Sequence, residues 1–215
     1  MSNSKSSKPL WILMMLFASQ ALFVLTLLNP DFVERNMLAE VDYIKFAYGE
    51  EEADKIVENT VSKSNSIMYD SGLIDNIRHM LLPKQYVETG LSDDQKFFDN
   101  RFWFYVDSAI QNIVLNVQYA LLRVYSVAPW VGLSVVIFLA SIISGYLSRE
   151  IKKHGFEYSS PLRHGMSRKV IYSMPVIFVV YIFTPVAIPI YIIPLFSIII
   201  AFSLNIIVAN TIKRV

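Results

Sequence analysis

Three long stretches of this chain are apolar and carry no charged residue. Lys, Arg, Asp and Glu are absent from residues 9–30, 124–148 and 170–212. A helix of about 20 apolar residues crosses the ~30 Å hydrocarbon core of a bilayer. The first two stretches are therefore long enough for one membrane helix each, and the third is long enough for two. This pattern predicts an all-α integral membrane protein with about four transmembrane helices.

The segment between the first two apolar stretches has the pattern of a separate helical domain. From Phe32 to Tyr48, apolar residues recur every three or four positions, which is the spacing of a buried helix face, and Gly49 is a suitable stop. The glutamates at 50–52 suit the first turn of a second helix, because acidic side chains interact favourably with the helix dipole there. A third, short helix is predicted at about 71–82.

A much longer helix is predicted to follow. Ser92 and Gln95 have the spacing of a capping box. The apolar positions behind them form one stripe, made of Phe98, Phe102, Val106, Ala109, Ile110, Ile113, Val117, Leu121 and Val124. We therefore expect one helix from about Ser92 to Lys153, whose stripe packs against the preceding helices. The aromatic cluster at 97–105 is too dense to face one core completely, so it is either core or a surface for a partner.

Charge distinguishes the two sides of the predicted membrane protein. Residues 31–123 contain 16 acidic and nine basic side chains, whereas residues 149–169 contain six basic and two acidic ones. Because basic loops stay in the cytoplasm, we expect both termini and residues 149–169 to be cytoplasmic. The acidic segment is then external, which is the periplasmic side where the membrane is a bacterial inner membrane. Four crossings also return the two termini to the same side.

These boundaries give the predicted organisation of the chain. It comprises a cytoplasmic leader at 1–8, transmembrane helix 1 at 9–29, a helical periplasmic domain at 30–123, transmembrane helix 2 at 124–148, a basic cytoplasmic loop at 149–169, transmembrane helix 3 at 170–186, transmembrane helix 4 at 189–210 and a cytoplasmic tail at 211–215. Residues 9–29 have features of a signal peptide. No small-x-small cleavage site follows their apolar run, so we interpret them as an uncleaved anchor.

The chain lacks the residue patterns of common catalytic and cofactor sites. It has no cysteine, which excludes disulfides and thiolate metal ligands. It also has no H-E-x-x-H, G-x-S-x-G or nucleotide-binding loop. His79 lies in the acidic segment, whereas His154 and His164 lie in the basic one, so the three cannot form one metal site. No ionisable residue falls inside a predicted span, which disfavours a transporter. We therefore expect a protein that is not an enzyme and has no cofactor.

Small side chains in the second predicted span favour close helix packing. Ser134, Ser141 and Gly145 lie on one helical face, and Ser141-x-x-x-Gly145 has the spacing that lets two membrane helices approach closely. Gln20 and Asn205 are the most polar residues deep in the predicted spans. Each is expected to make an interhelical hydrogen bond.

The segment from Gly145 to Pro161, GYLSREIKKHGFEYSSP, resembles the signature of the integrating conjugative element membrane proteins. This is an unknown-function domain family found beside the conjugative coupling ATPase. The family pattern has Arg-x-Ile-Lys-Lys followed by Phe-x-Tyr-x-Ser-Pro, and this chain has Ser144 where the family often has Asp. The resemblance covers about 120–215. It implies a non-enzymatic accessory of a conjugative type IV secretion or DNA-transfer apparatus, with the coupling ATPase as a partner.

The basic cytoplasmic loop is the predicted contact site for that partner. Its candidate residues are Arg149, Lys152, Lys153, Phe156, Tyr158, Ser160 and Pro161. Basic side chains alone would suit the headgroups of the lipid bilayer, whereas aromatic residues between them favour contact with a protein. Direct contact with nucleic acid is the least favoured reading, and a homo-oligomer is left open. The alternative function is a membrane-anchored sensor or exclusion protein, whose external helical domain recognises a ligand or an envelope partner.

Overall fold

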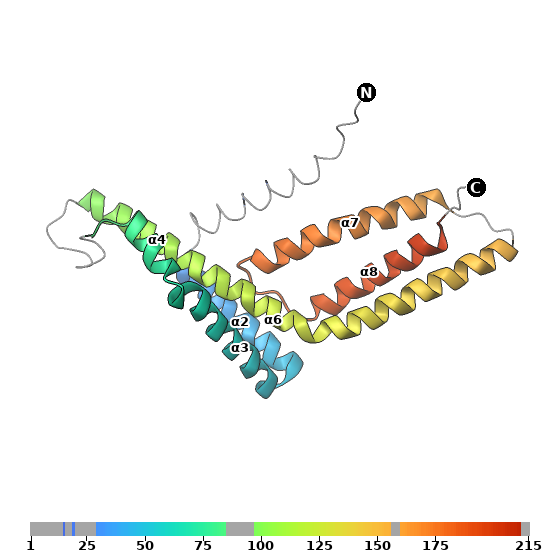
Figure 1. Ribbon diagram of the computed structural model, residues 1–215, viewed down its shortest axis with the longest axis horizontal. Coiled ribbons are helices and arrows are strands. Elements are labelled where there is room, and N and C mark those ends of the chain that lie inside the picture. Colours follow the sequence, from blue (N-terminus) through green and yellow to red (C-terminus); the bar gives the residue numbers. More distant parts are fainter. Residues whose placement is uncertain (1–14, 16–18, 20–28, 85–96, 156–159, 212–215) are drawn as a thin grey trace, which may run out of the picture. The chain divides into compact units, whose positions relative to one another are not determined.

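The computed structural model is helical over most of the residues that it describes, which are 15, 19, 29–84, 97–155 and 160–211 (Figure 1). These residues form α2 (Pro30–Tyr48), α3 (Glu50–Asn65), the π-helical segment η1 (Ser66–Asp70), α4 (Leu73–Leu81), α6 (Phe97–His154), α7 (Pro161–Phe183) and α8 (Ile192–Ala209). No strand occurs among them. Two compact units divide the chain. The first comprises Met1–Tyr125 and Ile182–Ile188, and the second comprises Ser126–Tyr181 and Pro189–Val215.

Local signals set the ends of α2 in the first unit. The Asn29 side chain accepts a hydrogen bond from the main-chain N–H of Asp31 at 3.2 Å, and Pro30 occupies the first turn, where its missing N–H costs nothing. Gly49 ends the helix at a φ of +84°, a conformation that favours glycine. The buried face of α2 is formed by Val33, Glu40 and Ile44.

Helix α3 and the short elements after it complete the first unit around the start of α6. Lys55 donates hydrogen bonds to Glu52 and Glu51 on the exposed face of α3; these bonds, that to Glu52 foremost, raise the pKa of Lys55. On the inner side, Met68 and Ile74 pack with Val114 of α6. An ion pair between Arg78 and Asp107, with 2.9 Å between Nη2 and Oδ1, joins α4 to α6.

The buried face of α6 differs from the predicted stripe. Phe102 and Val124 were expected in the core but are 60% and 48% exposed, so the prediction was wrong at these positions. Ile110 is buried as expected. Sequence spacing cannot tell an apolar side chain that faces lipid or a partner from one that faces the core. The predicted cap at Ser92 lies outside the described residues.

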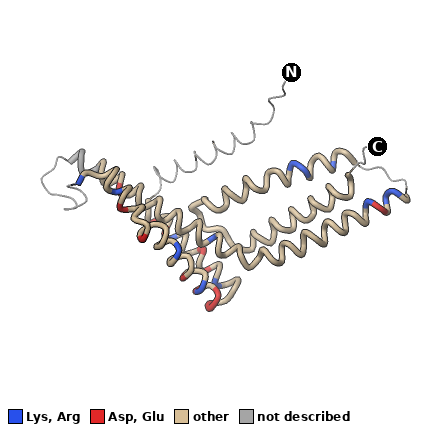
Figure 2. The backbone as a smooth tube through the Cα atoms, in the orientation of Figure 1, with Lys and Arg blue, Asp and Glu red and all other residues tan. Residues whose placement is uncertain are grey.

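Three of the described helices are long and apolar enough to cross a membrane, namely α7, α8 and α6 from Phe102 onward. Figure 2 shows charged residues gathered over α2, α3 and α4, at the end of α6 and near the start of α7. The predicted first span falls almost entirely outside the described residues. The expected loop at 149–169 is much shorter in the structure, because α6 continues to His154 and α7 begins at Pro161. Proline suits the first turn of a helix, so it begins α7 rather than preventing it.

Candidate functional site

A buried ion pair lies inside the first unit. The side chain of Arg123 is 0% exposed and that of Glu40 is 2% exposed. Two hydrogen bonds join them, from Arg123 Nε to Glu40 Oε1 at 2.8 Å and from Nη2 to Oε2 at 2.7 Å. The Tyr119 hydroxyl donates to Glu40 Oε2 at 2.7 Å, and its ring centroid lies 4.3 Å from the guanidinium carbon of Arg123. This two-pronged geometry is the strong form of an ion pair.

The same side chains hold the segment that connects α7 to α8. Arg123 donates from Nη1 to the Thr184 carbonyl and from Nη2 to the Val186 carbonyl, both at 2.6 Å. The Ile188 N–H donates to Glu40 Oε2 at 3.1 Å, and the Ala187 N–H donates to Asn36 Oδ1 at 3.1 Å. Buried main-chain groups need such partners when a segment has no secondary structure of its own. We call Asn36, Glu40, Tyr119 and Arg123 the clamp.

The clamp holds main chain in position. Both oxygens of Glu40 accept hydrogen bonds from the protein's own donors, Oε1 from Arg123 and Oε2 from three groups. Sequence reasoning missed these residues. One signal was present, because Glu40 occupies the same helical face as Val33 and Ile44, and a charge on an apolar stripe requires a buried partner.

In the second unit, the small residues of the predicted packing face lie against α8. Ser134 Oγ is 2.7 Å from Ser197 Oγ, and Asn205 Nδ2 donates to the main-chain carbonyl of Ser141 at 3.3 Å. At Gly145 the two backbones lie close together, since a Cβ there would lie 2.7 Å from the Asn205 carbonyl oxygen. Only glycine fits this distance without displacing α8.

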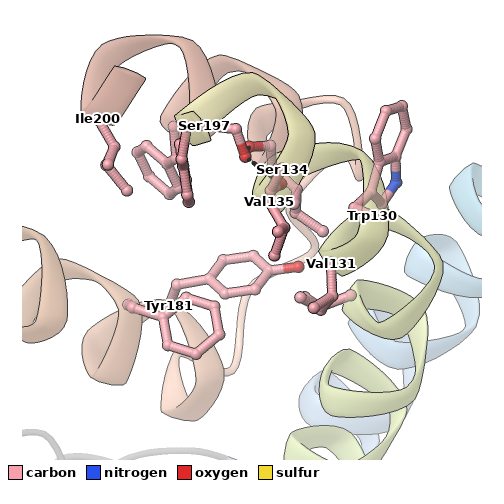
Figure 3. Close-up of a pocket in the computed structure, with 12 residues that line it drawn as sticks. Trp130, Val131, Ser134, Val135, Tyr181, Ser197 and Ile200 are labelled. Carbon is pink, nitrogen blue, oxygen red and sulfur yellow. Dashed lines mark hydrogen bonds between the residues drawn. The ribbon is translucent and has the colours of Figure 1, made fainter. Parts of the chain in front are cut away.

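A cavity of about 220 Å³ lies between α6, α7 and α8 in this unit. Its walls are apolar and aromatic, and none of its lining residues is charged. Figure 3 shows the Tyr181 ring extending toward Val131 of α6, and it shows the Ser134–Ser197 hydrogen bond at the edge of the cavity. A cavity with this lining suits an apolar group and offers no acid, base or nucleophile beyond hydroxyls.

Asn210 connects three helix ends at the basic side of the second unit. Its Oδ1 accepts from Lys152 Nζ at 3.3 Å and from the Ser160 N–H at 3.2 Å, and its Nδ2 donates to the Ile206 carbonyl at 2.8 Å. The side chain is buried, with 5% of the residue exposed. Asn210 therefore fixes the end of α6 and the start of α7 against α8.

The predicted partner-contact residues near Asn210 differ in their contacts and exposure. Lys152 and Ser160 are engaged by Asn210, and Lys153 forms an ion pair with Glu150 on the same helix. Arg149 is half-buried and Pro161 is exposed. Phe156 and Tyr158 lie outside the described residues. Within the described ranges, no group of three or more His, Asp or Glu side chains could hold a metal ion.

Comparison with known families provides the class of function that the geometry leaves open. The family described as IncC plasmid conjugative DNA transfer protein DtrJ-like matches residues 30–214. The chain belongs to this family. DtrJ-like membership confirms the predicted link to conjugation. The matched residues cover the acidic segment as well as the three described helices that are long enough to span a membrane. No curated protein and no solved structure matches the chain.

Proposed function

We propose that this protein is a non-enzymatic inner-membrane accessory component of a conjugative type IV secretion apparatus and that it associates with the coupling ATPase. The observation that carries the proposal is DtrJ-like membership across residues 30–214, in a chain of which three described helices are suited to span a membrane. The packing contacts described above join helices to one another, and the clamp holds main chain. Neither arrangement resembles a reaction centre.

The proposed contact surface is the basic end of α6 and α7. Arg163, Arg168 and Lys169 are exposed in the first turns of α7, and Lys153 is partly exposed at the end of α6. Asn210 holds the two helix ends together through Lys152 and Ser160. The exposed bases are therefore presented on a fixed frame, as charge-complementary recognition of an acidic protein surface requires.

Paired variants separate the protein-contact proposal from simple attraction to lipid. Phe156→Ala with Tyr158→Ala leaves the net charge unchanged, so membrane insertion and abundance should persist. Co-purification with the coupling ATPase and DNA transfer into recipient cells should both fall. Lys153→Gln with Arg168→Gln is the contrast, because it removes two charges and leaves the Asn210 contacts in place. Normal transfer by the aromatic variant, with failure of the charge variant alone, would refute the aromatic contact.

One observation in the first unit supports the alternative function, a sensor or exclusion protein. Phe102, Phe104 and Tyr105 are each more than half exposed on α6, and exposed aromatic clusters are typical of recognition surfaces. A sensor or exclusion protein would use such a surface. Placing the gene in recipient cells distinguishes the two functions: an exclusion protein lowers DNA uptake there, whereas an accessory of the transfer apparatus acts only in the donor.

A further inference from the structure

A second apolar groove lies between α7 and α8 and has a charge at one end. Its volume is about 440 Å³, and Arg163 lines it together with Met166, Val170, Ile199 and Phe202. Met166 and Phe202 are 60% and 67% exposed. The groove is separate from the cavity that contains Tyr181, and it shares no lining residue with it.

Small side chains make the groove deep enough to hold a chain of methylene groups. Ser167 of α7 and Ser203 of α8 both line it and are only 6% and 5% exposed. Larger side chains at these two positions would fill the space between the helices. The flanking apolar residues therefore form walls around a floor of small residues, an arrangement that leaves room for a ligand.

The position of Arg163 along α7 matches the depth of a lipid headgroup. All charged residues of α7 lie at or before Lys169, and none occurs from Val170 to Phe183. At about 1.5 Å of rise per residue, Val170 lies about 10 Å further along the helix than Arg163. The guanidinium thus belongs to the polar face of the bilayer, and the part of the groove from Val170 onward belongs to its acyl region.

We propose that this groove binds one anionic phospholipid, with the headgroup phosphate at Arg163 and an acyl chain along Val170, Ile199 and Phe202. A guanidinium binds phosphate oxygens in a two-pronged manner, and basic pockets between membrane helices are suited to acidic headgroups. Glu150 is the one acidic residue that the structure describes in the second unit, and it pairs with Lys153. None of the residues that line the groove is acidic.

A phospholipid would match both the charged end and the apolar part of the groove, whereas an apolar helix would match only the apolar part. A helix from a second copy or another membrane protein would cover Ile199 and Phe202. It would place no negative charge at Arg163 unless it carried an acid at the matching depth, which membrane helices rarely do. This inference does not rest on the proposed association with the coupling ATPase.

The test uses the full-length protein in detergent, with lipid binding counted by native mass spectrometry. Phosphatidylglycerol is the probe and phosphatidylcholine is the neutral comparison. Arg163→Gln should reduce the preference for phosphatidylglycerol about five-fold, which corresponds to one basic residue near an anionic surface. Arg168→Gln is the matched control, because it removes the same charge from the same helix and Arg168 does not line the groove.

A second pair of variants tests the acyl part. Ile199→Trp should fill the groove and lower binding of both lipids, whereas Leu195→Trp, also exposed on α8 and outside the groove, should not. Equal loss in the two arginine variants would mean diffuse charge attraction and would overturn the proposal. It would equally fail if Ile199→Trp abolished a dimer and left the lipid count unchanged, because a second copy would then occupy the groove.

Discussion

Arg123 is a guanidinium that is fully enclosed in the first unit, and its position determines how the protein responds to substitution there. Moving a charge out of water costs several kcal/mol, and only excellent geometry compensates for it. Here Glu40 and the carbonyls of Thr184 and Val186 provide that geometry. Removing one partner therefore leaves the other charge buried without compensation.

Arg123→Gln or Glu40→Gln should lower the free energy of unfolding by about 3–5 kcal/mol. The double variant Glu40→Leu with Arg123→Met should cost less than the sum of the two single changes, because it leaves no unpaired charge. Thermal unfolding of the detergent-solubilised protein measures both effects. Glu52→Gln is the control, since its ion pair with Lys55 is exposed and should change stability far less. Equal losses from Glu40→Gln and Glu52→Gln would contradict the role of the clamp.

Sequence patterns predicted where helices form better than they predicted which side chains contact one another. The pairing of Glu40 with Arg123 joins residues 83 positions apart, and no local spacing contains that information. Asn210 was placed only at the end of a span, although its side chain connects three helix ends. Both roles depend on tertiary neighbours, which a periodicity argument does not supply.

At the scale of elements, α6 and α8 approach each other closely at Gly145. The pattern Ser141-x-x-x-Gly145 was the sequence signal for a close approach, and the structure places both residues against Asn205. The sequence could not indicate which helix lies opposite. It also could not indicate that residues 161–169 belong to α7, because six basic residues between 149 and 169 have the composition of a loop.

Gly145→Ala should destabilise the protein by about 1–3 kcal/mol, the usual cost of overpacking. Its Cβ would meet the Asn205 carbonyl oxygen at 2.7 Å, and main chain cannot move aside easily. Gly132→Ala is the matched control in the same helix, since nothing lies within 4 Å of its Cβ position. Stability of that variant should be unchanged or slightly higher because alanine favours helix. Both are compared by thermal unfolding in detergent, and equal midpoints would exclude the close approach.

Charged substitutions can test which face of α6 is buried in the first unit. Ile110 is 2% exposed, so Ile110→Asp should cost more than about 4 kcal/mol by burying an unpaired carboxylate. Gln111→Asp places the same charge at an exposed neighbour, where loss of the hydrogen bond from Gln111 to Asp107 and repulsion from that carboxylate together cost about 1 kcal/mol. Limited proteolysis in membranes should digest the first variant rapidly and leave the second resistant. Equal resistance would refute the assignment of this face.

At the scale of the whole molecule, the charge pattern predicts which parts lie on which side of the membrane. The acidic helices α2 and α3 contrast with the basic end of α6 and the basic start of α7 (Figure 2). Helical class and membrane-spanning character could be predicted from apolar run length alone, because both depend on local composition. The predicted first span cannot be compared with the structure, since residues 9–29 are almost all outside the described ranges.

The predicted orientation can be measured by cysteine labelling, because the chain has no native cysteine. Asn65→Cys at the end of α3 and Gly155→Cys after α6 are both at exposed positions. In intact cells, an impermeant thiol reagent should label the first and not the second, because basic segments stay in the cytoplasm. The reverse labelling pattern would invert the proposed topology.

The clamp also has a consequence for the order of biosynthesis. Arg123 donates to carbonyls that follow it by 61 and 63 residues, so the ribosome has already made α7 before these acceptors exist. Until then, Glu40 is its nearest charged partner, and two of its hydrogen bonds are missing. A chain stalled or cleaved before Thr184 is therefore left with an incomplete, weakened first unit, which proteases attack most readily. In this way, the stability of the first unit depends on a segment that is made after α7, as well as on the helices made before it.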